Sequence, residues 1–127
     1  MNSLPDRHRR WIAIVNSRDL EGYVDLVTDD IVWIPPVGAA VVGRQGFRDW
    51  LKPFFSSYSY EYTSSDERYL DAGEWVVEYA NFETRMTPLS GGGPMSHRGS
   101  YTAIWRRDSS TWRIERYIDV GTLLRPD

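Results

Sequence analysis

The sequence contains no cysteine, a single lysine, Lys52, and two histidines, His8 and His97. The absence of cysteine excludes disulfide bonds, thiolate metal sites and a cysteine nucleophile. Schiff-base chemistry requires a lysine, and Lys52 follows a charged stretch typical of a solvent-exposed helix face. We therefore expect a function that depends on neither a thiol nor an imine.

The sequence also has little net charge and no long apolar segment. Its 15 basic and 18 acidic residues give a net charge of −3, which provides no positive field for binding nucleic acid. The longest uncharged run, residues 31–43, contains two prolines and is too short to span a membrane. Residues 1–11 are charged rather than apolar, so we expect no secretory signal and a cytoplasmic location.

Length and composition indicate one globular domain. The chain has 127 residues, of which 41% are hydrophobic, and domains average roughly 150 residues, so a single domain over residues 1–127 is expected. Aromatic residues are frequent, at 14%. Large rings fill cores and also line pockets for apolar, ring-shaped ligands, so both roles stay open for each ring.

The first half of the chain carries helical patterns. Apolar residues at three- and four-residue steps predict a helix over about 5–17 and a second from the Asp19 N-cap to Val27. Residues 31–34 and 39–42 are predicted to form a short hairpin. A third helix is predicted over about 44–56.

After residue 57 the pattern changes to a period of two, which predicts strands. Tyr58, Tyr60 and Tyr62 share one face of the first strand, and three more extended segments follow at 75–86, 97–107 and 111–122. Turn residues separate them, so we expect an antiparallel meander. The predicted fold class is α+β, with a curved, mostly antiparallel sheet wrapped around the N-terminal helices.

Several short strings follow one another in a recognisable order. They are Ile14-Val15-Asn16-Ser17-Arg18-Asp19-Leu20, Thr28-Asp29-Asp30-Ile31-Val32-Trp33, Pro36-Val37-Gly38, Gly43-Arg44-Gln45-Gly46-Phe47 and Trp112-Arg113-Ile114. With the order of elements, they resemble the nuclear-transport-factor-like cone, particularly its SnoaL-like polyketide cyclase and ketosteroid-isomerase-like branches. The resemblance covers nearly the whole chain. It implies a cone with an internal apolar pocket, a small hydrophobic ligand, no cofactor, and a homodimer formed through the sheet.

The resemblance does not extend to the ketosteroid isomerase site. Its general base immediately precedes a Pro-Val-Gly string, and Pro35 stands at that position here. Its oxyanion-binding tyrosine corresponds to Trp11, and its acidic partner falls near Tyr101. The limonene-epoxide-hydrolase-like branch fails similarly, because Asn81 and Arg116 fall near its two carboxylates. We therefore reject both specific activities, because the residues that each reaction needs are missing. A shared fold does not determine the reaction.

Alternation along the strands predicts one buried ion pair. On residues 75–86 the more apolar face includes Glu78, and on residues 111–122 it includes Arg116. These strands flank the 97–107 strand, so the two long side chains could meet across about 9–10 Å. We hypothesise that Glu78 is an acid or base and that Arg116 orients it or stabilises an oxyanion. A structural ion pair, or a bulge that reverses the pattern, are the alternatives.

Other polar residues have both structural and functional interpretations. His97 opens a strand at the expected pocket rim and could shuttle protons, or it could be an exposed loop-end residue. Tyr101 could donate to a ligand carbonyl or pack at a dimer seam, and His8 is expected in the core. Asp119 and Glu115 lie where SnoaL-like cyclases can carry a catalytic carboxylate, but the alternation places both outward. No metal site is predicted, because it would need both histidines and distant acids.

The leading hypothesis is a cofactor-free enzyme that acts on a small, hydrophobic, oxygenated, polyketide-like molecule by proton transfer leading to cyclisation, isomerisation or elimination. The predicted catalytic residues are Glu78, Arg116, His97 and Tyr101. The predicted substrate-binding residues are Trp11, Trp33, Trp50, Phe54, Tyr58, Phe82 and Trp105. Two alternatives stay open: a module that binds such a ligand without transforming it, and a dimerisation domain whose own rings fill the cavity.

Overall fold

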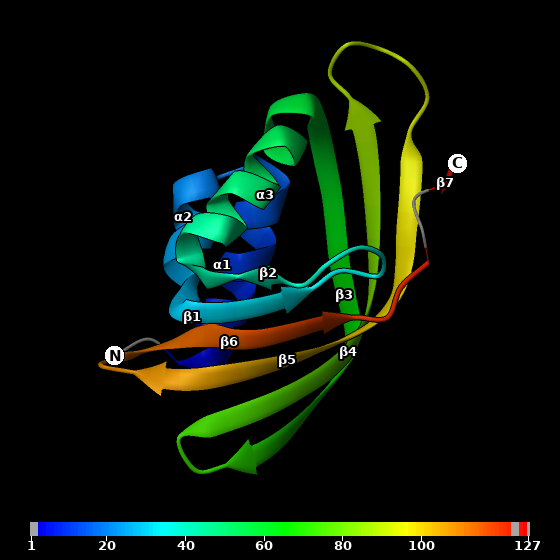
Figure 1. The fold of residues 1–127 in the computed structure, drawn as a ribbon. Coiled ribbons are helices and arrows are strands. Elements are labelled where there is room, and N and C mark those ends of the chain that lie inside the picture. The colour runs from blue at the N-terminus through cyan, green and yellow to red at the C-terminus, as the bar shows by residue number, and fades with distance from the viewer. Residues whose placement is uncertain (1–2, 123–124, 127) are drawn as a thin grey trace.

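The computed structural model describes residues 3–122 and 125–126. Three helices pack on one side of a curved, mostly antiparallel sheet that bends around them (Figure 1). The strands follow the order β2-β1-β6-β5-β4-β3, and β7 pairs with β5. The predicted α+β class and the curved sheet are confirmed.

The helices begin and end close to their predicted bounds. Helix α1, Leu4–Ser17, is capped by Ser3, whose side chain accepts from the Asp6 N–H. Helix α2, Leu20–Leu26, is capped by Asp19, as predicted. Helix α3, Gly43–Ser57, continues through Pro53. The apolar stripes of these helices face the sheet, and this burial holds the helices in place.

The predicted hairpin forms but starts earlier. Strand β1, Val27–Ile34, pairs antiparallel with β2, Val41–Val42. Val27 was expected in the helix, yet it is the first residue of β1 and lies opposite Ile114 of β6. That parallel pairing buries Val27 completely, so tertiary contact outweighs its place in the helical pattern.

The remaining long strands make the expected meander. They are β3 (Tyr58–Ala72), β4 (Trp75–Pro88), β5 (Met95–Asp108) and β6 (Thr111–Asp119), each antiparallel to the next. The short β7, Arg125–Pro126, pairs with the start of β5. The parallel β1–β6 pairing, which was not predicted, joins the hairpin to the meander. It brings residues from both halves of the chain to one inner face.

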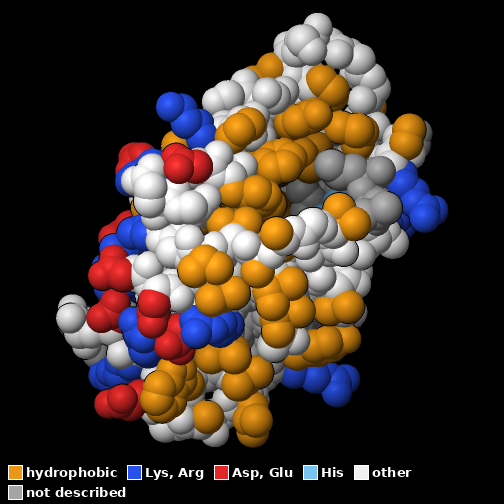
Figure 2. All heavy atoms as spheres, in the orientation of Figure 1, with side chains coloured by type: hydrophobic (Ala, Val, Ile, Leu, Met, Phe, Trp, Pro, Cys, Tyr) orange, Lys and Arg blue, Asp and Glu red, His pale blue; other side chains and the backbone are white. Residues whose placement is uncertain are grey.

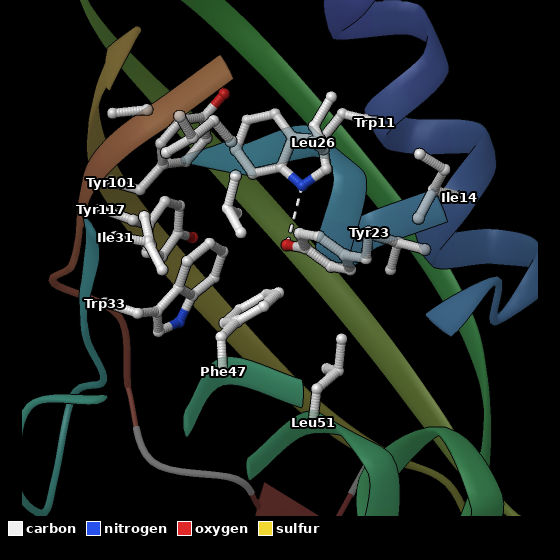
Figure 3. Packing of buried hydrophobic residues seen from close by; sticks show 14 of the residues in the cluster. Trp11, Ile14, Tyr23, Leu26, Ile31, Trp33, Phe47, Leu51, Tyr101 and Tyr117 are labelled. Carbon is white, nitrogen blue, oxygen red and sulfur yellow. Dashed lines mark hydrogen bonds between the residues drawn. The ribbon is translucent and has the colours of Figure 1, made fainter. Parts of the chain in front are cut away.

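Aromatic rings dominate the core between the helices and that inner face (Figure 3). Trp33 of β1 stacks on Tyr117 of β6, with ring centroids 3.8 Å apart and planes at 13°. Trp11 of α1 donates its indole N–H to the Tyr23 hydroxyl at 2.8 Å. Phe47 of α3 lies against Tyr23, with centroids 5.1 Å apart. These contacts fix the helices at a set distance from the sheet.

Within the described residues, none of the helices has the length and apolar character needed to cross a membrane.

Candidate active site

A cavity of about 400 Å³ opens between the helices and the inner face of the sheet. It corresponds to the hollow bordered by hydrophobic side chains in Figure 2. The rings in its wall belong to Trp11, Tyr23, Trp33, Trp50, Phe54, Phe55, Tyr60, Tyr62, Phe82, His97 and Tyr117. A mostly apolar, aromatic hollow with few polar groups is typical of a site for a small hydrophobic molecule.

Most residues predicted to contact substrate lie in this wall, namely Trp11, Trp33, Trp50, Phe54 and Phe82. Tyr58 does not; it stands at the junction of α3 and β3. Trp105 is fully buried away from the cavity, because α1 covers that part of β5 through Trp11. Neither residue lies at this cavity, since alternation along a strand says which face a ring occupies but not what covers that face.

His97 and Asp119 form a polar pair in the cavity wall. His97 lies near the start of β5 and lines the cavity, and its Nε2 lies 2.8 Å from Oδ2 of Asp119 at the end of β6. Their side chains are 14% and 11% exposed. The other ring nitrogen, Nδ1, faces the Thr122 carbonyl oxygen. Both nitrogens therefore face acceptors, and only the protonated ring has a donor for each.

The surroundings of His97 decide its charge. Burial alone would lower the pKa of His97, because it disfavours the charged ring. The hydrogen bond to Asp119 and its negative charge, together with the Thr122 carbonyl, act in the opposite direction and prevail, so the pKa is raised above 6.5. These contacts favour the protonated imidazole beside the carboxylate, and such a pair can give and accept protons at the edge of an apolar space.

Residues 119–122, which we call the C-terminal strap, run along β5 over this pair. The N–H of Val120 donates to the Ser100 carbonyl at 2.9 Å, and the N–H of Thr122 donates to the Arg98 carbonyl at 2.8 Å. The Thr122 hydroxyl also donates to the Arg98 carbonyl, at 3.2 Å. These bonds hold the strap against β5 and keep the Thr122 carbonyl at His97.

Two glycines allow this close approach. A Cβ on Gly121 would lie 2.7 Å from Cζ of Phe82 and 2.8 Å from Cε1 of His97, so no side chain fits there. Gly99 has φ of +153°, and a Cβ on it would lie 2.5 Å from the Gly121 Cα. The Gly121 N–H donates to Asp119 Oδ1 at 2.8 Å. Bare backbone at these positions lets the strap cover the pair.

The inward position of Asp119 corrects the outward placement that alternation predicts. Ile114 and Arg116 pair with consecutive residues of β5, which leaves Glu115 as an extra residue in a β-bulge. The bulge reverses the facing of the residues that follow, so Tyr117 and Asp119 line the cavity. One feature of the sequence pointed to this bulge: strict alternation along the strand would bury the charged guanidinium of Arg116.

Arg116 does not reach Glu78. Its Nη1 donates to the backbone carbonyls of Asp30 and Glu115, at 3.2 and 2.8 Å. The predicted ion pair between Glu78 and Arg116 was therefore wrong, and its cause is the same bulge.

Glu78 points inward as alternation predicts, but into a closed cluster rather than the cavity. Its Oε2 accepts from the Tyr101 hydroxyl at 2.6 Å and lies 2.9 Å from His8 Nε2. Its Oε1 accepts from the Trp105 indole N–H at 2.8 Å. Neither Glu78 nor its partners line the cavity. We call Glu78, His8, Tyr101 and Trp105 the Glu78 cluster.

Trp11 contacts both the cavity and the Glu78 cluster. It lines the cavity, and its ring centroid lies 5.7 Å from that of His8 and 5.3 Å from that of Tyr101. Pro35, at the position that the resemblance assigns to the isomerase base, also lines the cavity but has no group to titrate.

Among the residues described, no three His, Asp or Glu side chains gather in a way that could hold a metal ion.

Comparisons with known proteins agree with this fold. The family model described as SnoaL-like domain matches residues 8–117. A search of curated proteins returned no match. A conserved protein from Planctomyces limnophilus has a similar structure, with a TM-score of 0.86, 20% identity and coverage of 94% of this chain and 93% of that one.

Two further solved structures are similar. One is a protein from Novosphingobium aromaticivorans with a provisional assignment as a scytalone dehydratase, with a TM-score of 0.89, 10% identity and coverage of 98% and 85% of the two chains. The other is the hexachlorocyclohexane dehydrochlorinase LinA-type3 from Novosphingobium barchaimii, with a TM-score of 0.80, 13% identity and coverage of 97% and 86%. At these identities the likeness shows the fold alone.

Proposed function

Because the chain belongs to the SnoaL-like domain family, we propose that it is a cofactor-free enzyme that binds a small, hydrophobic, oxygenated molecule and catalyses its cyclisation, isomerisation or elimination by proton transfer. The observation that carries the proposal is the His97–Asp119 pair in the wall of the aromatic cavity. The dehydratase and dehydrochlorinase names of similar structures are consistent with elimination chemistry in this fold.

The cavity provides the conditions that proton transfer needs. Its wall is mostly apolar, and in such a medium of low dielectric constant the charges of His97 and Asp119 act on a bound molecule more strongly than they would in water. A positioned acid or base contributes typically 10²- to 10⁴-fold to a rate. Each Asp119 oxygen makes one of the hydrogen bonds described above and keeps a further lone pair that can accept a proton from the ligand.

The proposed step conserves protons. Asp119 accepts a proton from carbon and then gives that proton to an oxygen of the same molecule, which yields an enol or releases water from a hydroxyl leaving group. The His97 imidazolium keeps its two N–H groups on Asp119 and the Thr122 carbonyl, and its charge stabilises the Asp119 carboxylate. Asp119 ends the step deprotonated, so the starting pair is restored. Nothing outside the site is consumed.

The roles predicted for the other catalytic candidates change with this geometry. We propose that His97 and Asp119 perform the chemistry and that the Glu78 cluster supports Trp11 from behind the cavity wall. Tyr101 then acts on Glu78 rather than on the ligand. Arg116 holds the β1–β6 junction through backbone carbonyls and takes no part in catalysis.

The test uses 5-nitrobenzisoxazole, a planar bicyclic compound that opens its N–O bond when a base removes its C3 proton. We expect the wild-type protein to accelerate this reaction above buffer, and His97→Gln and Asp119→Asn each to lower kcat/KM by about 100-fold. Tyr58→Phe, outside the cavity, is the control and should retain the wild-type rate.

Two results would contradict the enzyme proposal. Unchanged turnover in both variants, with the probe still bound, would indicate that the pair does no proton transfer. Tight binding without turnover in the wild-type protein would favour the ligand-binding module, and mass spectrometry of co-purified molecules would then identify its ligand.

We also propose a homodimer that buries the outer face of the sheet. On that face Tyr79 of β4, Thr102 of β5, Ile118 of β6 and Ile34 of β1 form one row, and the three apolar members, Tyr79, Ile118 and Ile34, are 47%, 39% and 39% exposed. Apolar side chains in one row of an uncovered sheet favour association with a second copy. Ile118→Lys should convert a dimer to a monomer in sedimentation velocity, whereas a wild-type monomer would refute the proposal.

A further inference from the structure

The inner face of β4 carries two polar residues, Glu78 and Thr84, among apolar ones. Glu78 has a hydrogen-bond donor on each of its carboxylate oxygens. Thr84 is 7% exposed, and its hydroxyl makes no hydrogen bond with any described residue. A polar group that faces inward and is not satisfied by the fold calls for a partner from outside the chain.

The Thr84 hydroxyl is accessible from the cavity. Thr84 lines the cavity wall. In the described chain, the unpaired side-chain oxygens that are closed to solvent belong to Thr28, Tyr62 and Thr111. The Thr84 oxygen is not among them, so it retains accessible surface in a residue that is otherwise covered. A ligand that covers this hydroxyl takes it away from water and must offer it a hydrogen bond in return.

The sheet register places Thr84 beside the proposed catalytic pair. Thr84 lies directly opposite His97 in the β4–β5 ladder, where the Cβ atoms of a cross-strand pair are about 4.5–5.5 Å apart. Strand β5 lies between β6 and β4, so Asp119 and Thr84 are on opposite sides of His97. The Phe82 ring, on the same face of β4 as Thr84, has its centroid 4.9 Å from that of His97. One molecule lying on Phe82 can contact Asp119 at one end and Thr84 at the other.

The charges in the wall select for a neutral molecule. No lysine or arginine among the described residues lines the cavity. His97, which also lines it, is already paired with Asp119. A bound carboxylate or phosphate would lose its hydration without gaining a free positive partner, which is costly.

We propose that Thr84 is a specificity-determining residue whose hydroxyl hydrogen-bonds a carbonyl or hydroxyl oxygen of the ligand, at the end of the molecule remote from the C–H bond on which Asp119 acts. This inference rests on the proposed function and deepens it by naming the ligand class: neutral ring compounds with an oxygen substituent at that remote end. An apolar cavity of about 150 Å³ holds one benzene, so about 400 Å³ suits two fused rings.

The experiment compares 1-tetralone, which has a carbonyl oxygen, with tetralin, which has the same fused rings without it. Isothermal titration calorimetry gives the dissociation constant of each probe for the wild type and for three variants. Thr84→Val keeps the shape of the side chain but loses the hydroxyl, so the preference for 1-tetralone over tetralin should fall about fivefold, the typical effect of one net hydrogen bond. Thr84→Ser keeps the hydroxyl and should keep the preference. Thr63→Val makes the same chemical change on the outer face of β3 and should leave the preference unaltered.

A structural role for the hydroxyl would show in stability. Because the Thr84 hydroxyl has no partner in the described chain, Thr84→Val should unfold in urea at a midpoint no lower than that of the wild type. A lower midpoint would reveal a partner within the fold and refute the inference.

The binding outcomes separate this inference from the function on which it rests. If Thr84→Val keeps the wild-type preference, the hydroxyl does not bind the ligand oxygen and the inference is wrong. An equal loss of preference in Thr84→Val and Thr84→Ser would mean that only the shape of the side chain matters, which also refutes it. If neither probe binds the wild-type protein, the ligand class is wrong. In each case the benzisoxazole assay decides the His97–Asp119 proposal separately. A lower preference in Thr84→Val without benzisoxazole turnover in the wild type would support the role of Thr84 and contradict the enzyme proposal.

Discussion

The chain's two histidines each lie beside a carboxylate, at nearly the same nitrogen–oxygen distance. His8 Nε2 is 2.9 Å from Glu78, and His97 Nε2 is 2.8 Å from Asp119. Glu78 also accepts from a phenol and an indole and is completely buried. Asp119 and His97 instead line a cavity and are covered by bare backbone. The same two functional groups are closed off in one place and accessible in the other.

Under the proposed function, surroundings and not residue type separate the structural pair from the reactive one. In the Glu78 cluster the carboxylate is enclosed by donors from α1 and β5, so a ligand has no way to approach it. At the cavity, the carboxylate faces a space of about 400 Å³. A buried carboxylate with a full set of hydrogen-bond partners stabilises the fold. A carboxylate that is only partly removed from water, beside a cavity, is prepared for proton transfer.

The largest expected effect comes from breaking the closed pair. Glu78→Gln replaces an acceptor oxygen with an amide NH₂ that meets the Tyr101 or Trp105 donor, so one buried donor loses its acceptor. We expect a loss of about 3 kcal/mol in the free energy of unfolding. The measurement is urea unfolding followed by circular dichroism.

The matched change at the open pair, Asp119→Asn, should cost much less stability, about 1 kcal/mol, and much more turnover. A Glu78→Gln protein that is as stable as wild type but inactive would reverse the assignment of the two pairs.

A smaller effect is expected from crowding the open pair. In Gly121→Ala the new methyl would lie 2.7 Å from Phe82 and 2.8 Å from His97, so the strap or the imidazole must move. We expect about 2 kcal/mol of destabilisation from overpacking, together with reduced benzisoxazole turnover. Gly93→Ala is the control, because nothing lies within 4 Å of an added Cβ there. Equal effects of the two substitutions would show that the strap does not hold His97.

The smallest effect is the pH dependence of the open pair. The pKa of His97 is raised in the folded state, so protonated His97 contributes stability that is fully present below pH 6.5 and is lost as pH rises through the folded pKa. NMR titration should place the His97 pKa above 6.5, and the unfolding free energy should fall with pH in that window. His97→Gln should remove this part of the pH dependence, and its persistence in that variant would assign it to another group.

Much of the fold was predictable from local pattern. The three helices, the hairpin and the meander follow from three-, four- and two-residue periods, with caps at Asp19 and turns at glycine and aspartate. The exception is the start of β1, where Val27 belongs to the helical stripe but pairs with Ile114, far away in the sequence. A long-range strand contact is invisible to local periodicity.

The candidate site was only partly predictable. The inward direction of Glu78 and five of the predicted wall rings follow from alternation and from the family resemblance. The role of Asp119 does not, because the bulge at Glu115 reverses the facing of the strand end that carries it. Nor could alternation tell that α1 covers Glu78 and leaves His97 beside a hollow.

The amino-acid sequence by itself determined the elements, their order and the kinds of side chain available, since these depend on neighbours along the chain. Tertiary structure alone decided which acid meets which histidine and which of the two pairs lies at the cavity. Those outcomes depend on one extra residue in β6 and on two glycines where β5 and the strap approach each other. Contacts between distant segments leave no periodic pattern in the sequence, so only the folded chain shows them.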